Sequence, residues 1–313
     1  MLGKTAGGLY WMFRYLERME NLARLVDTGQ RMALTRADTD DTEWASTLAT
    51  AGVRSIFDQH HDEVTGEAVI DFLLRSEDNP SSVMSCVANA RMNARTVRTA
   101  LTREVWSAFN ECWMTLKEDL ARKLSVRDLP RVIATIRARS AFVRGAMHGT
   151  MLRNDIYDFA RLGTFMERAD ATARMLDVKY YVLLPSIAGV GSRLDNFQWE
   201  MILHAVSAEG SFRLVHGNKR GSAAIAEFLI LDSRMPRSLA FCYKKIDDNL
   251  AYLQQDYGIR LPCHDMADKT CRRLEQLTIE DVFEEGLHQF LQDFQRRNAA
   301  LGLQIEQDYR FTK

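Results

Sequence analysis

The chain has 313 residues, of which 46% are hydrophobic and 27% are charged, which is typical of a globular protein with one large domain or two ordinary ones. Its 41 basic and 42 acidic residues give a formal charge of -1, so bulk electrostatics favour neither nucleic acid nor an anionic membrane as a partner. The sequence contains neither the run of about 18 apolar residues that a membrane span needs nor an apolar signal core at its start, so we expect a cytoplasmic protein.

Apolar residues recur at three- and four-residue spacing along most of the chain, and proline and glycine are sparse, with five and 17 residues. This pattern predicts an all-α fold. In chain order, we expect helices near residues 6–36, 42–59, 66–76, 81–101, 103–122, 127–150, 153–184, 195–208, 221–231, 236–256 and 278–308. Gly258, Pro262 and several polar residues favour a loop with room for one short helix over 257–277.

Helix boundaries carry their own signals. Asn79–Ser82 reads Asn-Pro-Ser-Ser, which suits a helix start because proline is tolerated in the first turn and the small polar side chains cap free amides. Ser125–Asp128, followed by Pro130, has the same character. Pro185–Gly191 should end the helix that begins near residue 153 and open a loop. Because the connections are short, we expect an antiparallel bundle.

One charged segment occurs twice in the sequence. Residues 17–27 read ERMENLARLVD, and residues 167–177, which lie 150 positions later, read ERADATARMLD. An acid is also kept at Glu20 and Asp170. The identical positions are Glu17/Glu167, Arg18/Arg168, Ala23/Ala173, Arg24/Arg174 and Asp27/Asp177.

Two further matches occur in the same order. Residues 71–86 align with 227–242 at a shift of 156, and Trp44, Leu48, Phe57 and His61 align with Trp199, Leu203, Phe212 and His216 at a shift of 155. A short insertion at Pro185–Gly191 explains the change of spacing. The matches predict a duplication, with residues 1–150 and 151–313 as two helical repeats packed into one bundle with pseudo-twofold symmetry.

The repeated segment concentrates charge on one stripe of a helix. At roughly 100° per residue, Glu20, Arg24 and Asp27 fall on the same stripe as Glu17, while Arg18 lies at the edge of the apolar side. Arg168 takes the same place in the second copy, so both arginines should be at least half-buried and need carboxylate partners. On an exposed surface the stripe would form only intrahelical pairs.

If the two copies lie side by side, their charges form one polar network. The network either fixes the packing register of the bundle or lines a cleft for an anionic or zwitterionic ligand. Its candidate residues are Glu17, Arg18, Glu20, Arg24, Asp27, Glu167, Arg168, Asp170, Arg174 and Asp177.

Signatures of known chemistries do not occur in the sequence. The sequence lacks the two Glu-x-x-His motifs that a di-metal site needs, because only Glu285 and His288 have this spacing. It also lacks a phosphate-binding loop around Gly3-Lys4-Thr5 and a Gly-x-Ser-x-Gly elbow. Cys263, His264 and Asp265 are adjacent in sequence. This does not indicate a catalytic triad, because the members of a triad come together in space and not through adjacency in sequence. The five cysteines have no Cys-x-x-Cys pair, and Cys86 and Cys242 at matching repeat positions suit core packing. We therefore expect neither metal nor cofactor.

The combination of Leu9–Arg24, Asn79–Val83 and Arg161–Asp170 resembles the bacterial alpha-E family, a helical domain with a Glu-Arg motif, over residues 1 to about 253. The family's signature residues fall on Glu17, Arg18, Glu167 and Arg168. Members tend to be encoded beside, or fused to, a circularly permuted ATP-grasp protein, often with a transglutaminase-like protein. The resemblance thus implies a role in ATP-driven amide-bond formation.

Three functions follow as hypotheses. The first is a non-catalytic helical partner of an ATP-grasp ligase in peptide synthesis or modification. The second is an enzyme in which Arg18 and Arg168 clamp a peptide-like carboxylate while Glu17 or Glu167 transfers a proton. The third is a purely structural scaffold, which should have no concave polar pocket between the charged helices. The sequence leaves homo-oligomerisation open.

Overall fold

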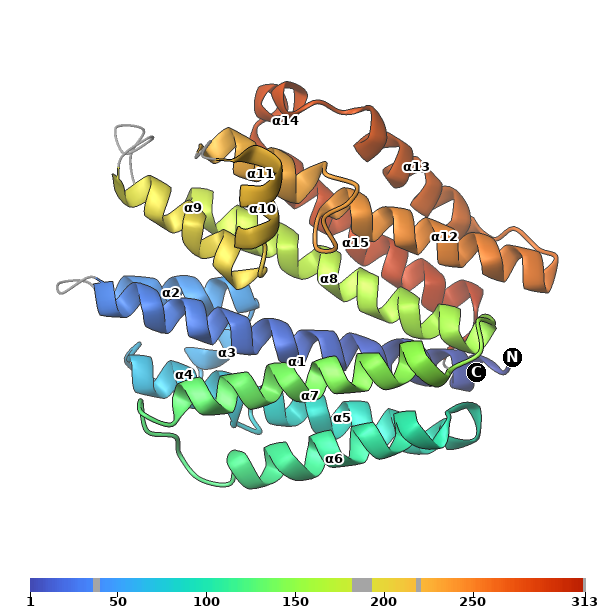
Figure 1. The fold of residues 1–313 in the computed structure, drawn as a ribbon, viewed down its shortest axis with the longest axis horizontal. Helices are drawn as coiled ribbons and strands as arrows, with labels where there is room; N and C mark the ends of the chain where they lie inside the picture. The colour runs from blue at the N-terminus through green and yellow to red at the C-terminus, as the bar shows by residue number, and fades with distance from the viewer. Residues whose placement is uncertain (36–39, 182–192, 218–220, 312–313) are drawn as a thin grey trace.

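The computed structural model describes residues 1–35, 40–181, 193–217 and 221–311. These residues form 15 α-helices and one 3-10 turn, with no strand among them, which confirms the predicted all-α class (Figure 1). The first elements are α1 (Gly3–Thr35), α2 (Asp40–Ala51), α3 (Arg54–Phe57), α4 (Gly66–Leu74), α5 (Val83–Thr96), η1 (Arg98–Ala100), α6 (Arg103–Asp119) and α7 (Leu129–Thr150). The others are α8 (Asp155–Tyr181), α9 (Arg193–Ala205), α10 (Glu209–His216), α11 (Ser222–Ile230), α12 (Leu239–Tyr257), α13 (Pro262–Gln276), α14 (Ile279–Glu285) and α15 (Leu287–Asp308).

The two helices that carry the repeated charged segment, α1 and α8, lie side by side in the middle of the bundle (Figure 1). α5 and α7 also pack on α1, with α6 outside them, and α12 and α15 pack on α8. The short helices α2–α4 and α9–α11 gather at one end, and both chain termini lie at the other. No described helix is long and apolar enough to cross a membrane.

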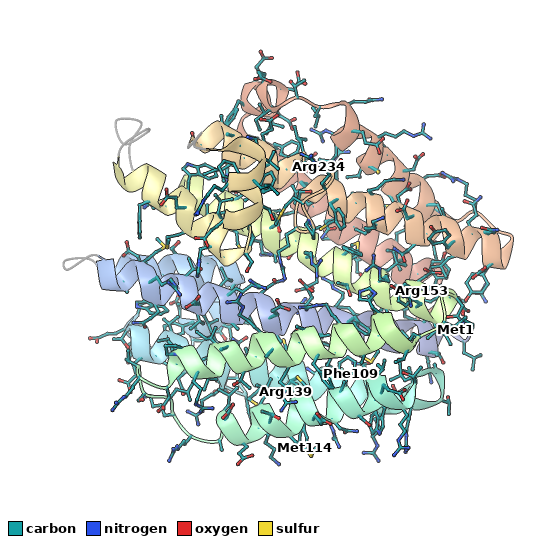
Figure 2. All side chains as sticks on the ribbon, in the orientation of Figure 1. Met1, Phe109, Met114, Arg139, Arg153 and Arg234 are labelled. Atoms are coloured by element: carbon teal, nitrogen blue, oxygen red, sulfur yellow. The ribbon has the colours of Figure 1, made fainter. Side chains whose placement is uncertain are left out.

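The core runs along the whole bundle, because α1 and α8 are covered on several sides. Tyr10, Phe13 and Leu16 of α1 are buried against their neighbours. In Figure 2, Phe109 of α6 lies inside the molecule, whereas Met114 lies on the outer edge of the same helix. All five cysteines are buried as free thiols, which confirms core packing for Cys86 and Cys242.

Several helix boundaries agree with the sequence signals. Ser82 caps α5 by accepting a hydrogen bond from the amide of Ser85 at 3.1 Å, and Ser238 caps α12 in the same way. α7 begins at Leu129, directly before Pro130. The loop predicted at Pro185–Gly191 lies outside the described residues.

Two predicted helices are each broken at a glycine. The helix expected over 42–59 is interrupted at Gly52, with φ of +71°, and the one expected over 278–308 is interrupted at Gly286, with φ of +92°. These backbone angles favour glycine, because other residues clash there. Single continuous helices were therefore the wrong prediction for both segments.

The segment 257–277 was predicted as a loop with room for one short helix, and this was wrong in extent, because Pro262–Gln276 forms the 15-residue helix α13. Its polar residues cover one face, and the buried face is spaced at three and four residues through Cys263, Ala267, Cys271 and Leu274. Proline stands in the first turn, where it does not interrupt helical hydrogen bonds. A further helix, α10, was missed between the predicted helices 195–208 and 221–231.

Aromatic packing repeats in the two halves. The matching triads are Phe57, His61, Phe72 and Phe212, His216, Phe228. The first phenylalanine stacks on the histidine at 4.2 Å between ring centroids in one triad and 4.6 Å in the other, and it meets the second phenylalanine edge-on at 5.2 and 5.5 Å. Trp44 and Trp199 are both buried. These local matches agree with the predicted repeat, and pseudo-twofold symmetry of the whole halves stays a prediction.

Asp158, in the first turns of α8, is a buried acid among other acids, with only 5% of its surface exposed. Burial, followed by the nearby carboxylates of Asp256 and Asp155, raises its pKa to about 7. The folded state therefore holds this proton at a pH where the unfolded chain, with a pKa of about 3.9, has lost it. Stability from this group is present at low pH and is lost as pH rises from about 4 to about 7.

We expect Asp158→Asn to remove this pH dependence, because the amide stays neutral. The difference in stability between the variant and the wild type should be small near pH 4.5 and much larger at pH 8, where the variant is the more stable, as measured by urea unfolding at both values. Asp265→Asn, at an exposed acid, is the control and should leave the pH profile unchanged. An Asp158→Asn profile parallel to that of the wild type would contradict the assignment.

Candidate functional site

The backbones of α1 and α8 touch upstream of the charged segments. A Cβ atom placed on Gly163 of α8 would lie 2.0 Å from the carbonyl oxygen of Tyr10 in α1, so only glycine fits there. This close approach brings the two copies of the charged segment within reach of each other. The side-by-side arrangement that a joint polar network requires is thus present.

The two Glu-Arg copies pair reciprocally across the helices. Arg18 donates from Nε and Nη2 to Glu167 Oε1 and Oε2 at 2.6 and 2.9 Å. Arg168 donates through the same two nitrogens to Glu17, at 2.9 Å each. Each pair is a two-point contact between a planar guanidinium and a carboxylate, which is the strongest form of protein ion pair. Both arginines are largely buried, as the sequence predicted.

Three further arginines complete this centre, and sequence reasoning missed them. Arg14 of α1 donates to Glu167 at 2.9 Å, Arg144 of α7 contacts Glu20, and Arg237 contacts both Glu17 at 2.9 Å and Glu20 at 3.2 Å. Arg144 and Arg237 come from other parts of the chain. One signal existed, because the repeat has Pro80-Ser81-Ser82 in its first copy and Pro236-Arg237-Ser238 in its second.

The other predicted site residues divide into two groups. Arg24 pairs with Glu20 at 2.5 Å and Arg174 with Asp170 at 2.7 Å, both within one helix. Asp27 and Asp177 lie away from the centre, where Asp27 contacts His204 at 3.1 Å and Asp177 contacts His288 at 2.5 Å. We call the joined part, together with the adjacent Asp170–Arg174 pair, the central network: Arg14, Glu17, Arg18, Glu20, Arg24, Arg144, Glu167, Arg168, Asp170, Arg174 and Arg237.

The central carboxylates are buried but stay ionised. Glu17 is 1% exposed and Glu167 is 5% exposed. Burial acts to raise the pKa of Glu167, but the facing guanidinium groups of Arg18 and Arg14 outweigh it and hold the pKa at about 2. Arg168 and Arg237 likewise outweigh burial and lower the pKa of Glu17. At neutral pH neither group carries a proton to give, and neither accepts one readily.

Glu-Arg occurs only at residues 17–18 and 167–168 of the sequence, and both copies lie at the centre of this network. A family model named Alpha-E, described as a predicted alpha-helical domain with a conserved ER motif, matches residues 1–309. The chain belongs to the Alpha-E family. In this Alpha-E chain the two Glu-Arg dipeptides bind each other.

The Alpha-E chain is also similar to uncharacterised proteins of Mycobacterium bovis and Mycobacterium tuberculosis. It is 23% identical to each over 304 residues, which cover 91% of this chain and 34% of each relative. The chain therefore spans about a third of the length of these curated relatives. No solved structure was found to match it.

A polar pocket of about 220 Å³ opens between α1 and α8 on the side of Arg18. Charged groups line one part of it and small or aliphatic residues the other. The lining residues are Arg18, Asn21, Leu22, Leu25, Thr50, Ala51, Gly52, Val53, Ile56, Ser81, Glu167, Asp170, Ala171 and Arg174. A purely structural scaffold should have no such concavity, so this prediction of the scaffold hypothesis was wrong.

Proposed function

We propose that this Alpha-E chain is a non-catalytic helical partner of a circularly permuted ATP-grasp ligase that forms amide bonds in peptide synthesis or modification, and that a transglutaminase-like protein acts with them. The observation that carries the proposal is the saturation of the central glutamates. Glu17 and Glu167 are each held by at least two guanidinium groups and remain ionised. Such groups fix the packing of α1 against α8.

The same contacts disfavour the enzyme alternative. In that alternative Arg18 and Arg168 clamp a substrate carboxylate through their forked nitrogens, but both forks are already filled by protein carboxylates. Glu17 would have to exchange a proton, and its lowered pKa opposes that. A helical module that shapes or presents another protein's substrate needs neither step.

The lengths of the relatives support a partnership. In the mycobacterial proteins, the region similar to this chain is about a third of a longer polypeptide. A domain that is fused to other domains in some proteins can bind the same domains as separate chains in other proteins. Fusion and non-covalent binding bring the same surfaces together, and they differ in the effective concentration.

The test is co-expression with a circularly permuted ATP-grasp ligase from the same genome. We expect the two chains to purify together in a fixed ratio, and ATP-dependent amide formation by the ligase to increase when this chain is added. The isolated chain should show no ATP binding by calorimetry. Full ligase activity without any contact between the chains, or clear ATP binding by this chain alone, would overturn the proposal.

A further inference from the structure

The central network has a filled side and an open side. Under the repeat alignment, Arg237 corresponds to Ser81. On the filled side the guanidinium of Arg237 lies against Glu17 and Glu20. On the open side Ser81 has only a short hydroxyl, which accepts a weak hydrogen bond from Arg18 Nη1 at 3.5 Å. Ser81 lines the pocket, so the pocket lies beside the residue that the sequence alignment matches with Arg237.

Asn21 lines this pocket, and its side chain carries a buried donor without a partner. Asn21 is 4% exposed, and its Oδ1 accepts a hydrogen bond from Arg237 Nη1 at 3.0 Å. Because a guanidinium only donates, this contact fixes the amide orientation and puts Nδ2 on the side away from Arg237. Nδ2 has no hydrogen-bond partner, and a buried amide left in this way costs about 1–3 kcal/mol. An acceptor in the pocket would satisfy it.

The charge balance indicates the sign of the missing group. The central network contains seven arginines and four carboxylates, which leaves three positive charges in surplus. Burial of this surplus is already visible at Arg237, whose pKa falls to about 10 through desolvation despite Glu17. An anion placed beside Arg18 and Arg174 reduces the imbalance.

We propose that this pocket binds a small amino-acid-like ligand, with its carboxylate on Arg18 Nη1, Asn21 Nδ2 and the Arg174 guanidinium, and its ammonium facing Asp170. Arg174 uses Nε for Asp170 Oδ2 at 2.7 Å, so its terminal nitrogens remain for a ligand. The volume of about 220 Å³ is below the about 300–1,000 Å³ of drug-sized sites, which limits the ligand to a small molecule.

Two features favour a carboxylate over a phosphate and an aliphatic over a polar side chain. Glu167 and Asp170 line the pocket, and their charges repel a dianion more than a monoanion. The remaining wall contains Leu22, Leu25 and Ile56, which suit an aliphatic group. This binding does not depend on docking to a ligase, so its test is independent of the test of the proposed function.

The experiment is calorimetric titration of the purified chain with four probes. L-Leucine carries every proposed group, 4-methylpentanoate lacks the ammonium, L-leucinamide lacks the carboxylate, and inorganic phosphate tests a different anion. We expect L-leucine to bind most tightly, 4-methylpentanoate more weakly, and the other two at least about tenfold more weakly than L-leucine, since each lost charged hydrogen bond removes about 1.5–3 kcal/mol. No binding of L-leucine at millimolar concentration, or equal binding of L-leucinamide or phosphate, would overturn the proposal.

Variants locate the binding in this pocket. Asn21→Asp keeps the acceptor for Arg237 but puts an acceptor where Nδ2 was, so L-leucine affinity should fall at least about tenfold. Arg174→Gln should have a similar effect. Arg31→Gln is the matched control, because Arg31 also pairs with an acid four residues before it but lies outside the pocket and the central network, and this variant should bind as the wild type does. Circular dichroism checks folding of each. Unchanged affinity in folded Asn21→Asp and Arg174→Gln, or an equal loss in Arg31→Gln, would show that the ligand binds elsewhere.

Discussion

Replacing Glu167 with glutamine should lower the free energy of unfolding by about 3–5 kcal/mol, which is the usual loss when one partner of a buried ion pair is removed. The substitution keeps the shape of the side chain but removes the negative charge. Arg14 and Arg18 then face a neutral amide within a buried site, with no other carboxylate at hydrogen-bond distance in the described residues. Urea unfolding at neutral pH measures the effect.

The control for this variant is Glu67→Gln, because Glu67 pairs with Lys123 while both side chains are more than half exposed. That change should cost less than about 1 kcal/mol. In the wild type, the low pKa of Glu167 contributes stability that is fully present above its ordinary pKa of 4.5 and lost as pH falls toward about 2. Equal losses in the two variants would contradict the stabilising role of the network.

Gly163→Ala should be strongly destabilising although it adds only a single methyl group. The added carbon would lie 2.0 Å from the Tyr10 carbonyl oxygen and 2.9 Å from the carbonyl carbon, which is backbone and cannot rotate away. α1 and α8 must therefore separate, and overpacking of this kind costs about 3 kcal/mol or more. We expect a loss of that size in the free energy of unfolding, measured by denaturant titration.

Gly145→Ala in α7 is the matched control, because an added carbon there meets no atom within 4 Å. It should raise stability by up to about 1 kcal/mol through helix propensity. Comparing the two variants separates the steric effect at Gly163 from the general effect of replacing glycine with alanine in a helix. A stabilised Gly163→Ala would show that the two backbones do not touch as described.

Much of the fold could be predicted because helical periodicity and capping are local. The start of α5 after Ser82 and the pairing of the two Glu-Arg helices followed from residue spacing and repetition. The breaks at Gly52 and Gly286 were missed because a glycine inside an apolar period is compatible with a continuous helix. Only the surrounding packing decides whether its backbone turns.

The candidate site was predicted in outline and missed in detail for a related reason. Periodicity places Glu17 and Arg18 on their own helix, but it cannot say which residues approach from elsewhere. Arg144 and Arg237 reach the centre from α7 and from the turn before α12. Their charges are ordinary in sequence, and only the tertiary arrangement makes them partners of buried glutamates.

The reciprocal ion pairs also affect the order in which the chain can fold. Glu167 and Arg18 are 149 residues apart, and Arg168 and Glu17 are 151 apart, so each contact closes a loop of nearly half the chain. During synthesis α1 leaves the ribosome long before α8 exists, and until then Glu17 and Arg18 lack the partners that α8 supplies. α1 is therefore made before α8 but completes its packing only after it, because the central side chains of α1 need partners that follow about 150 residues later.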